Sequence, residues 1–124
     1  MTEPVLVDTS VWVSHLRASS SGLVALLQEA LVVCHPFVIG ELALGNLGNR
    51  SEILTLLEDL PGVEVARHEE VMAFIEKRNL PGRGLGYVDV HLLASALLSG
   101  VALWTEDKRL AQAAEGLEFH YPEP

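Results

Sequence analysis

The chain has 124 residues, of which 49% are hydrophobic and 20% charged, a balance typical of one globular domain and not of a disordered chain. Its formal net charge of −9 argues against general affinity for nucleic acids, because phosphate contacts depend on Lys and Arg. The eight basic residues nevertheless include two local clusters, at 77–83 and at 108–109. We therefore expect one domain over residues 1–124 that can hold a polyanion only locally.

The sequence argues against a membrane-spanning segment and against an internal disulfide. The first residues carry an acid, Glu3, and no basic leader, and no apolar run reaches the ~18 residues of a membrane span. We expect a cytoplasmic protein. The single cysteine, Cys34, follows Val32 and Val33 and has no partner for an internal disulfide, which indicates a buried thiol and not a nucleophile.

Predicted helices and strands alternate along the chain. The first predicted strand is the apolar run at 4–7, and the others are short apolar runs at 32–35, 63–66, 101–104 and 117–120. Helical spacing or composition predicts helices over 9–17, 23–31, 37–47, 50–60, 68–78, 87–98 and 107–114. We expect Asn49 and Glu52 to form a capping box at the fourth helix. Four helix breakers make 79–86 the longest predicted loop.

This alternation favours an α/β fold with a central, mostly parallel sheet flanked by helices. In such sheets the functional groups collect at the carboxyl ends of the strands. The sequence shows no internal repeat and no zinc-type spacing of Cys and His. We therefore looked for chemistry at the predicted strand ends.

Four carboxylates stand apart from the other acids. Asp8 follows the first strand inside VLVDTSVWV, and Asp107 follows the strand at 101–104 by three residues. Glu41 is the only charge between His35 and Arg50, and Asp89 lies in the apolar stretch LGYVDVHLLASALL. An ionised carboxylate among buried side chains costs several kcal/mol unless it is paired, hydrogen-bonded or bound to a metal.

Two interpretations of these acids are open. Asp8 alone is as well explained as the N-cap of the helix that begins at Thr9. Glu41 and Asp89 are predicted inside helices, where capping does not apply. Four acids that meet at one sheet edge without cations would repel one another, and a divalent cation would relieve the repulsion.

Carboxylate oxygens without Cys or His neighbours suit Mg²⁺ or Mn²⁺. Such a site can orient and activate a water for attack on a phosphodiester. The basic side chains fit this chemistry, because Arg83 precedes Asp89 by six residues and Lys108 and Arg109 follow Asp107. The sequence therefore predicts metal-dependent phosphodiester hydrolysis, with these three cations as contacts to the substrate.

The sequence resembles the PIN-domain ribonucleases, and most closely the VapC-type toxins of toxin–antitoxin pairs. The resemblance covers essentially the whole chain. It is carried, in the family's order and spacing, by VLVDTSVWV with Asp8, FVIGELALG with Glu41, GYVDVHLLASAL with Asp89 and LWTEDKRL with Asp107.

The resemblance implies a PIN-like fold and an endoribonuclease that uses Mg²⁺ or Mn²⁺ on RNAs such as tRNA or rRNA. It implies that Asp8, Asp89 and Asp107 are catalytic metal ligands and that Glu41 is a ligand directly or through a water. Ser10 and Thr105 resemble the hydroxyl residues that hydrogen-bond the acids. The family also implies a homodimer and a VapB-type antitoxin that places a basic side chain in the acidic site. Contact with DNA would come only through the antitoxin.

The motifs also bear on three rival functions. A receiver domain needs an adjacent acid pair, and here Asp8 lies between Val7 and Thr9. A haloacid-dehalogenase-like phosphatase needs a second Asp where Ser10 stands. A PIN fold that only binds its antitoxin, without catalysis, is the more serious rival, and the four intact acids count against it.

The remaining candidates are expected to have structural roles, apart from one loop. His91 lies about 200° around its helix from Asp89, which favours packing over general-base catalysis. Trp12 and Trp104 are expected in the core, although base stacking was the alternative. The glycines and Arg83 of the 79–86 loop suggest a flexible segment that contacts RNA phosphate.

Overall fold

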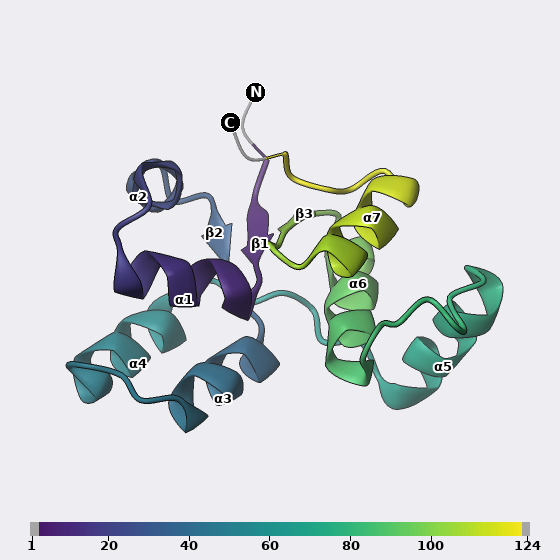
Figure 1. Cartoon of the computed structure of the whole chain (residues 1–124), viewed down its shortest axis with the longest axis horizontal. Coiled ribbons are helices and arrows are strands. Elements are labelled where there is room, and N and C mark those ends of the chain that lie inside the picture. The colour runs from purple at the N-terminus through teal and green to yellow at the C-terminus, as the bar shows by residue number, and fades with distance from the viewer. Residues whose placement is uncertain (1–2, 123–124) are drawn as a thin grey trace.

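The structure, a computed structural model, describes residues 3–122 and places three short strands among seven helices within that range. The elements in chain order are β1 (Val5–Val7), α1 (Thr9–Arg17), α2 (Ser21–Gln28), β2 (Val32–Val33), α3 (Pro36–Leu44), α4 (Arg50–Asp59), α5 (His68–Lys77), α6 (Tyr87–Ser99), β3 (Ala102–Trp104) and α7 (Lys108–Gly116). Figure 1 shows α1 to α4 to the left of β1 and α5 to α7 to its right. The predicted α/β class is confirmed.

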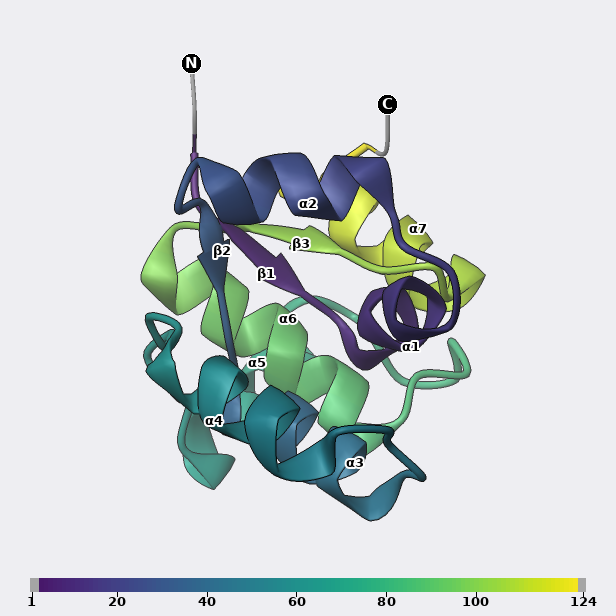
Figure 2. The same cartoon turned by 90° about the vertical axis from the view of Figure 1, so that its left-hand side faces the viewer.

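The sheet is parallel, with β1 between β2 and β3. All three residues of β1 are buried, as expected of a central parallel strand covered on both faces. The carboxyl ends of β1 and β3 lie side by side, because Val7 pairs with Trp104. In Figure 2 the three strands are seen from the side of α1 and α4.

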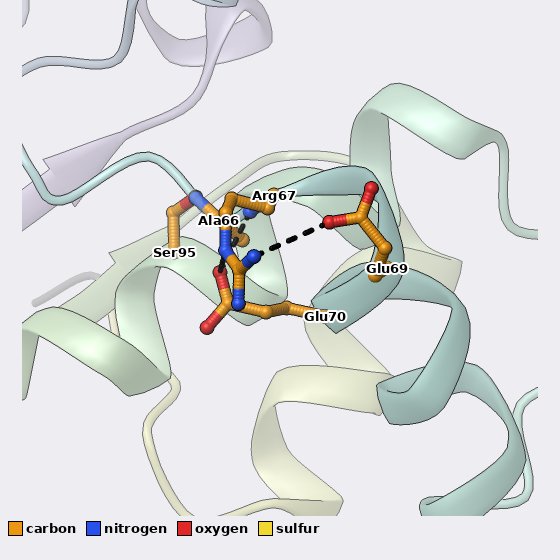
Figure 3. A network of polar contacts seen from close by, with 5 residues as sticks. All are labelled: Ala66, Arg67, Glu69, Glu70 and Ser95. Atoms are coloured by element: carbon orange, nitrogen blue, oxygen red, sulfur yellow. Dashed lines mark hydrogen bonds and ion pairs between the residues drawn. The ribbon is translucent and has the colours of Figure 1, made fainter.

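Two predicted strands are not formed as strands. The segment 63–66 carries no strand, and 117–120 is reduced to a single bridge between His120 and Leu103. In the first segment, α6 hydroxyls take N–H groups that a partner strand would otherwise bind. Glu64 N donates to Ser99 Oγ at 2.8 Å, and Ala66 N donates to Ser95 Oγ at 3.1 Å, the latter shown in Figure 3. The segment is therefore an extended connection held on α6.

The start of α5 is also held by side-chain bonds. Glu70 Oε1 accepts a hydrogen bond from Arg67 N at 2.8 Å, the reciprocal half of a capping box. The Arg67 guanidinium lies 3.5 Å from Glu69 and 3.4 Å from Glu70 (Figure 3). Exposed ion pairs contribute only about 0–1 kcal/mol, so the backbone bond to Glu70 is the main local anchor.

The predicted capping box at α4 is wrong. Asn49 is the N-cap residue, but its side chain makes no capping bond, and its φ of 52° places it in the left-handed region. Arg50 instead donates from Nη2 to the carbonyl oxygen of Ala43 at 2.7 Å, which ties the turn back to α3. The side chain of Asn49 is left exposed.

The core lies around β1, β3 and α6. Leu92 and Leu93 of α6 are fully buried, and Trp12 and Trp104 are 5% and 2% exposed, which confirms their predicted place in the core. Burial raises the pKa of Cys34 to about 11, in agreement with the predicted unreactive thiol. No helix of residues 3–122 has the length and apolarity needed to cross a membrane.

Candidate active site

Four segments bring the selected carboxylates to the carboxyl end of the sheet. Asp8 directly follows β1 and Asp107 follows β3, while Glu41 lies on α3 and Asp89 in the first turn of α6. The charges of Asp8, Glu41 and Asp107 all act on Asp89, which places these three acids within electrostatic reach of Asp89. The sequence therefore identified acids that do share one region.

Asp8 is buried and firmly held. It is 7% exposed, and its Oδ2 atom accepts hydrogen bonds from Ser10 Oγ and from Thr105 Oγ1, both at 2.8 Å. Asp8 is the N-cap residue of α1 by position, but its side chain makes no capping bond. Of the two interpretations of Asp8, capping through the carboxylate is therefore excluded. The hydrogen bonds expected of Ser10 and Thr105 are present.

Asp107 is fixed by the start of α7. Its Oδ1 atom accepts from the backbone N–H groups of Arg109 and Leu110, at 2.9 and 3.0 Å, so that Asp107 caps the helix. Asp107 N in turn donates to Thr105 Oγ1 at 3.0 Å. Thr105 thus bonds to both Asp8 and Asp107 and sets the distance between their segments.

Glu41 and Asp89 have fewer bonds to the protein. Glu41 is exposed, and its Oε1 atom accepts from Thr9 Oγ1 at 2.6 Å. Asp89 Oδ2 accepts from Gly86 N at 3.1 Å, the bond of an acid in the first helical turn to the residue that precedes the helix. The expectation that capping does not apply to Asp89 is wrong, because α6 begins only two residues before it.

Each of the four carboxylates keeps one oxygen atom without a hydrogen bond from residues 3–122. The bonded atoms are Asp8 Oδ2, Glu41 Oε1, Asp89 Oδ2 and Asp107 Oδ1, and the second oxygen of each is uncommitted. Within the same range the only ion pairs are those of Arg67 with Glu69 and Glu70. Each of the four acids is therefore anchored through one oxygen and has a second oxygen available to a ligand.

The pKa of Asp89 is raised, first by burial of its carboxyl group and then by the charges of Asp8, Asp107 and Glu41. The Gly86 N–H opposes the rise, because it stabilises the carboxylate. A nearby cation would remove the repulsive part of this shift. Asp89 is thus the acid on which the mutual repulsion of the group is most visible.

Whether these residues suit a divalent cation was judged from the donors. Four carboxylates with free oxygens match the hard oxygen ligands that Mg²⁺ and Mn²⁺ prefer. No three Asp, Glu, His or Cys side chains of the described chain converge closely enough to hold an ion as they stand. The residues therefore fit a hard cation in donor type and charge, although as placed they do not form a complete ligand set.

The three predicted substrate cations differ in their surroundings. Arg83 and Lys108 are exposed, in the 79–86 loop and in the first turn of α7. The Arg109 side chain instead lies against Gly84, where an added Cβ would meet Nη1 at 2.7 Å. Arg109 therefore supports the loop as well as facing solvent.

His91 packs as predicted. It is 4% exposed, and its ring lies 4.6 Å from the Phe37 ring and 5.2 Å from the Tyr87 ring, measured between centroids. The neighbouring His35 forms a hydrogen bond of 3.2 Å between its Nε2 atom and Ser95 Oγ, and its Nδ1 atom accepts a hydrogen bond from Phe37 N. The two histidines join α3 to α6, the helices that carry Glu41 and Asp89.

Three residues of the site escaped the sequence argument. Thr9 binds Glu41, Gly86 binds Asp89, and Glu106 accepts a hydrogen bond from Ser14 Oγ at 2.6 Å while its own N–H donates to Ser10 Oγ. Thr9 and Glu106 are direct neighbours of Asp8 and Asp107 in the sequence. That adjacency was the available signal, but nothing in the sequence specifies which side chain crosses to which acid.

The comparisons with known proteins agree with this geometry. The family model described as "PIN domain" matches residues 5–116. Over 110 residues the chain is 52% identical to Ribonuclease VapC32 of Mycobacterium tuberculosis, in strains CDC 1551 and H37Rv, covering 88% of this chain and 89% of that protein.

Two solved structures share the fold. PAE2754 from Pyrobaculum aerophilum has a TM-score of 0.62 at 20% identity, covering 92% of this chain and 81% of its own. FitAcB from Neisseria gonorrhoeae has a TM-score of 0.58 at 21% identity, covering 90% and 93%. The family match, the close relative and the four motif acids lead to one assignment: the chain belongs to the PIN-domain family, among its VapC-type toxins.

Proposed function

We propose that this protein is a divalent-metal-dependent endoribonuclease and the toxin of a VapBC-type pair. The observation that carries the proposal is the set of four carboxylates, each anchored through one oxygen and free at the other, with no described cation paired to them. The relationship to Ribonuclease VapC32 supports RNA as the substrate. We expect the protein to act in the cytoplasm on RNAs such as tRNA or rRNA.

Asp8, Asp89 and Asp107 would hold the ion, and Glu41 would reach it directly or through a water. Mg²⁺ or Mn²⁺ bound there would lower the pKa of a water and stabilise charge that develops on the phosphate oxygens. The protein's own contribution is orientation: two hydroxyls fix Asp8, and the α7 N-terminus fixes Asp107. Bonds of this kind hold ligands at the required angle and typically matter about 10–100-fold to activity or metal affinity.

The substrate would be held by few cations. Arg83 and Lys108 are exposed on two segments that lead to the acids, and Arg109 lies on the same α7 turn as Lys108. Because the chain has a net charge of −9, we expect RNA binding to depend on these local contacts and to weaken with salt.

A protein partner is supported by an apolar groove between α1, α2 and α4. Its volume is about 340 Å³, and its lining is apolar except for His15, with Leu56 60% exposed. Apolar grooves of this kind accept amphipathic peptide segments. We propose that a VapB-type antitoxin covers this side of the toxin, that the toxin forms a homodimer and that DNA is reached only through the antitoxin.

The test is RNA cleavage with Mg²⁺ or Mn²⁺ by the purified protein and by Asp8→Asn and Asp89→Asn. We expect cleavage by the parent and its loss in both variants, while circular dichroism shows an unchanged fold. Cleavage that persists in well-purified variants would contradict the assignment. An intact parent that binds its antitoxin but cleaves no RNA with either ion would establish the non-catalytic PIN module instead.

A further inference from the structure

A second hollow adjoins the acidic site and is not used by the proposed chemistry. It has a volume of about 680 Å³, within the range of small-molecule sites, and lies between α1, α3 and the turn that leads to α4. We name it the side pocket and define it by Val13, Leu16, Arg17, Glu41, Asn46 and Asn49. Because Glu41 belongs to both, a ligand in the side pocket would lie next to the metal-binding acids.

Apart from Glu41, the polar side chains that define the side pocket make no contact within the described part of the chain that holds the fold. Arg17 is exposed at the end of α1 and is in no ion pair with any residue in 3–122. Asn46 and Asn49 are exposed, and neither side chain makes a hydrogen bond within that range. Asn49 stands at an N-cap, where its amide would ordinarily bind the backbone, and yet its amide is free.

The walls of the side pocket suit the two parts of a nucleotide. Val13 and Leu16 present an apolar surface, being 39% and 38% exposed, on which a flat base can lie. The amides of Asn46 and Asn49 carry both donors and acceptors for the edge of a base. The Arg17 guanidinium matches a phosphate in charge and in geometry.

A peptide occupant fits less well. The apolar groove between α1, α2 and α4 shares Leu16 and Ile53 with the side pocket. Its polar side-chain groups are the His15 ring and the buried indole N–H of Trp12, and the described residues that line it include no Arg, Lys or amide side chain. The side pocket has a free cation and two free amides, and it ends at a catalytic acid. These differences assign the groove to protein and the side pocket to nucleic acid.

We propose that the side pocket binds the RNA nucleotide adjacent to the scissile phosphate, with its base between the apolar wall and the two amides and its phosphate at Arg17. The inference rests on the proposed ribonuclease function and names where its substrate lies. A base can enter the hollow only when it is unpaired and turned out of a helix.

Binding tests the proposal separately from catalysis. The Asp89→Asn protein, which we expect to be inactive but folded, is titrated by fluorescence anisotropy against a labelled single-stranded RNA. On this background Arg17→Ala should raise Kd about tenfold, because it removes a charge-assisted contact, and should lower the salt slope by about one. The matched control is Arg67→Ala, an exposed arginine at the start of α5 that lies outside both basic clusters and does not line the side pocket.

Base recognition is tested with RNAs that lack one base. After the cut made by the parent enzyme is mapped, each nucleotide beside it is replaced by an abasic one. We expect KM to rise for one of these positions only, and the rise to disappear in a variant that combines Asn46→Ala with Asn49→Gly. Glycine is chosen at position 49 because it tolerates the φ of 52°. Gln28→Ala, an exposed amide at the end of α2, is the control.

The failures of the two proposals are distinguishable. A parent that cleaves RNA, with Arg17→Ala and the asparagine variant indistinguishable from their controls, overturns the side-pocket proposal alone. A parent that neither binds nor cleaves RNA overturns both. If Arg17→Ala leaves RNA binding unchanged but releases the protein from its co-expressed antitoxin, the hollow belongs to the peptide and the proposal is wrong.

Discussion

Two of the three aspartates of the site, Asp8 and Asp89, are held in different ways. Asp8 is buried and accepts two short hydroxyl hydrogen bonds, from Ser10 and Thr105. Asp89 is half-buried and accepts a single backbone bond, from Gly86 at the end of an irregular loop. Asp8 thus belongs to a rigid wall built from β1 and β3, and Asp89 to a wall whose position depends on the 79–86 loop.

The difference separates two requirements of a cation site. The two hydroxyl bonds of Asp8 fix the direction of its carboxylate in the absence of any ligand. At Asp89, burial and the charges of the other three acids raise the pKa, so its ionised form is the less favourable one. Asp8 therefore supplies a carboxylate that is already oriented, and Asp89 supplies one whose ionised form a bound cation would stabilise.

The largest expected effect is on activity. Asp8→Asn and Asp89→Asn should each reduce RNA cleavage by at least about 100-fold, since even the loss of an outer hydrogen bond costs about 10–100-fold. Their stabilities should differ: in metal-free buffer at pH 7, Asp89→Asn should raise Tm by removing an unfavourable charge, and Asp8→Asn should lower it. Calorimetry checks this, and equal shifts in Tm would remove the distinction between the two walls.

The second effect concerns the hydroxyls. Thr105→Val should reduce activity about 10–100-fold and cost about 1–3 kcal/mol of stability. The variant removes the hydroxyl that donates to Asp8 Oδ2 and that accepts from Asp107 N. Thr9→Val, at the exposed Glu41, should cost less in both measurements. Urea unfolding and cleavage rates would decide, and an equal cost at the two threonines would contradict a rigid Asp8 wall.

The third effect depends on pH and tests the contact between α3 and α6. Burial and the charge of His91 lower the pKa of His35 to about 4, whereas the unfolded residue titrates near 6.5. The unfolded chain therefore binds the additional proton between these values, and stability should fall as the pH drops from 6.5 to 4, by at most about 1.4 kcal/mol per pH unit for this group.

Protonation of Asp89 acts in the opposite direction, because its pKa is raised in the folded state. His35→Asn keeps an acceptor for Phe37 N and should flatten the pH dependence of urea unfolding without abolishing it, since the pKa of His91 is also lowered. A variant as acid-sensitive as the parent would show that His35 is not a source of the dependence.

The smallest effect concerns the 79–86 loop, which ends at the Gly86 N–H that binds Asp89. Gly82 and Gly84 both have positive φ, 77° and 75°, so an Ala at either position costs roughly 1–2 kcal/mol of backbone strain. Only at Gly84 would the added Cβ also meet the Arg109 guanidinium, which adds about 1 kcal/mol. Comparing the two variants by thermal unfolding isolates the Arg109 contact, and adding Arg109→Ala to Gly84→Ala should recover the difference. Equal costs at both glycines would show that this contact is unimportant.

Local helices, the central strand and the candidate acids could be predicted from the sequence more successfully than the contacts between distant residues. The helix at 9–17 and the central apolar strand followed from patterns that are local. The strand predicted at 63–66 does not form because its N–H groups bind Ser95 and Ser99, which lie 29 and 35 residues further along the chain on α6, and no local pattern encodes such contacts. Asp8, Glu41 and Asp89 were found because an unpaired charge in an apolar stretch is itself a local signal, and Asp107 was found because it follows a predicted strand.

The environment of each acid was less predictable. Ser10 and Thr105 came from the family resemblance, whereas the bond from Thr9 to Glu41 and the free amides of Asn46 and Asn49 depend on how α1 and α3 meet. A hydrogen bond across 32 residues needs the fold, and so does the knowledge that a capping asparagine does not cap.

The most direct test of the account is a Mn²⁺ titration by isothermal calorimetry of the parent and of five variants: Asp8→Asn, Glu41→Gln, Asp89→Asn, Asp107→Asn and the control Glu106→Gln. Glu106 is an exposed acid beside Asp107 that lies outside the proposed ligand set. The account predicts one class of metal site whose affinity falls in the first four variants and is retained in Glu106→Gln. A parent that binds no Mn²⁺, or an affinity unchanged by loss of the four acids, would contradict it.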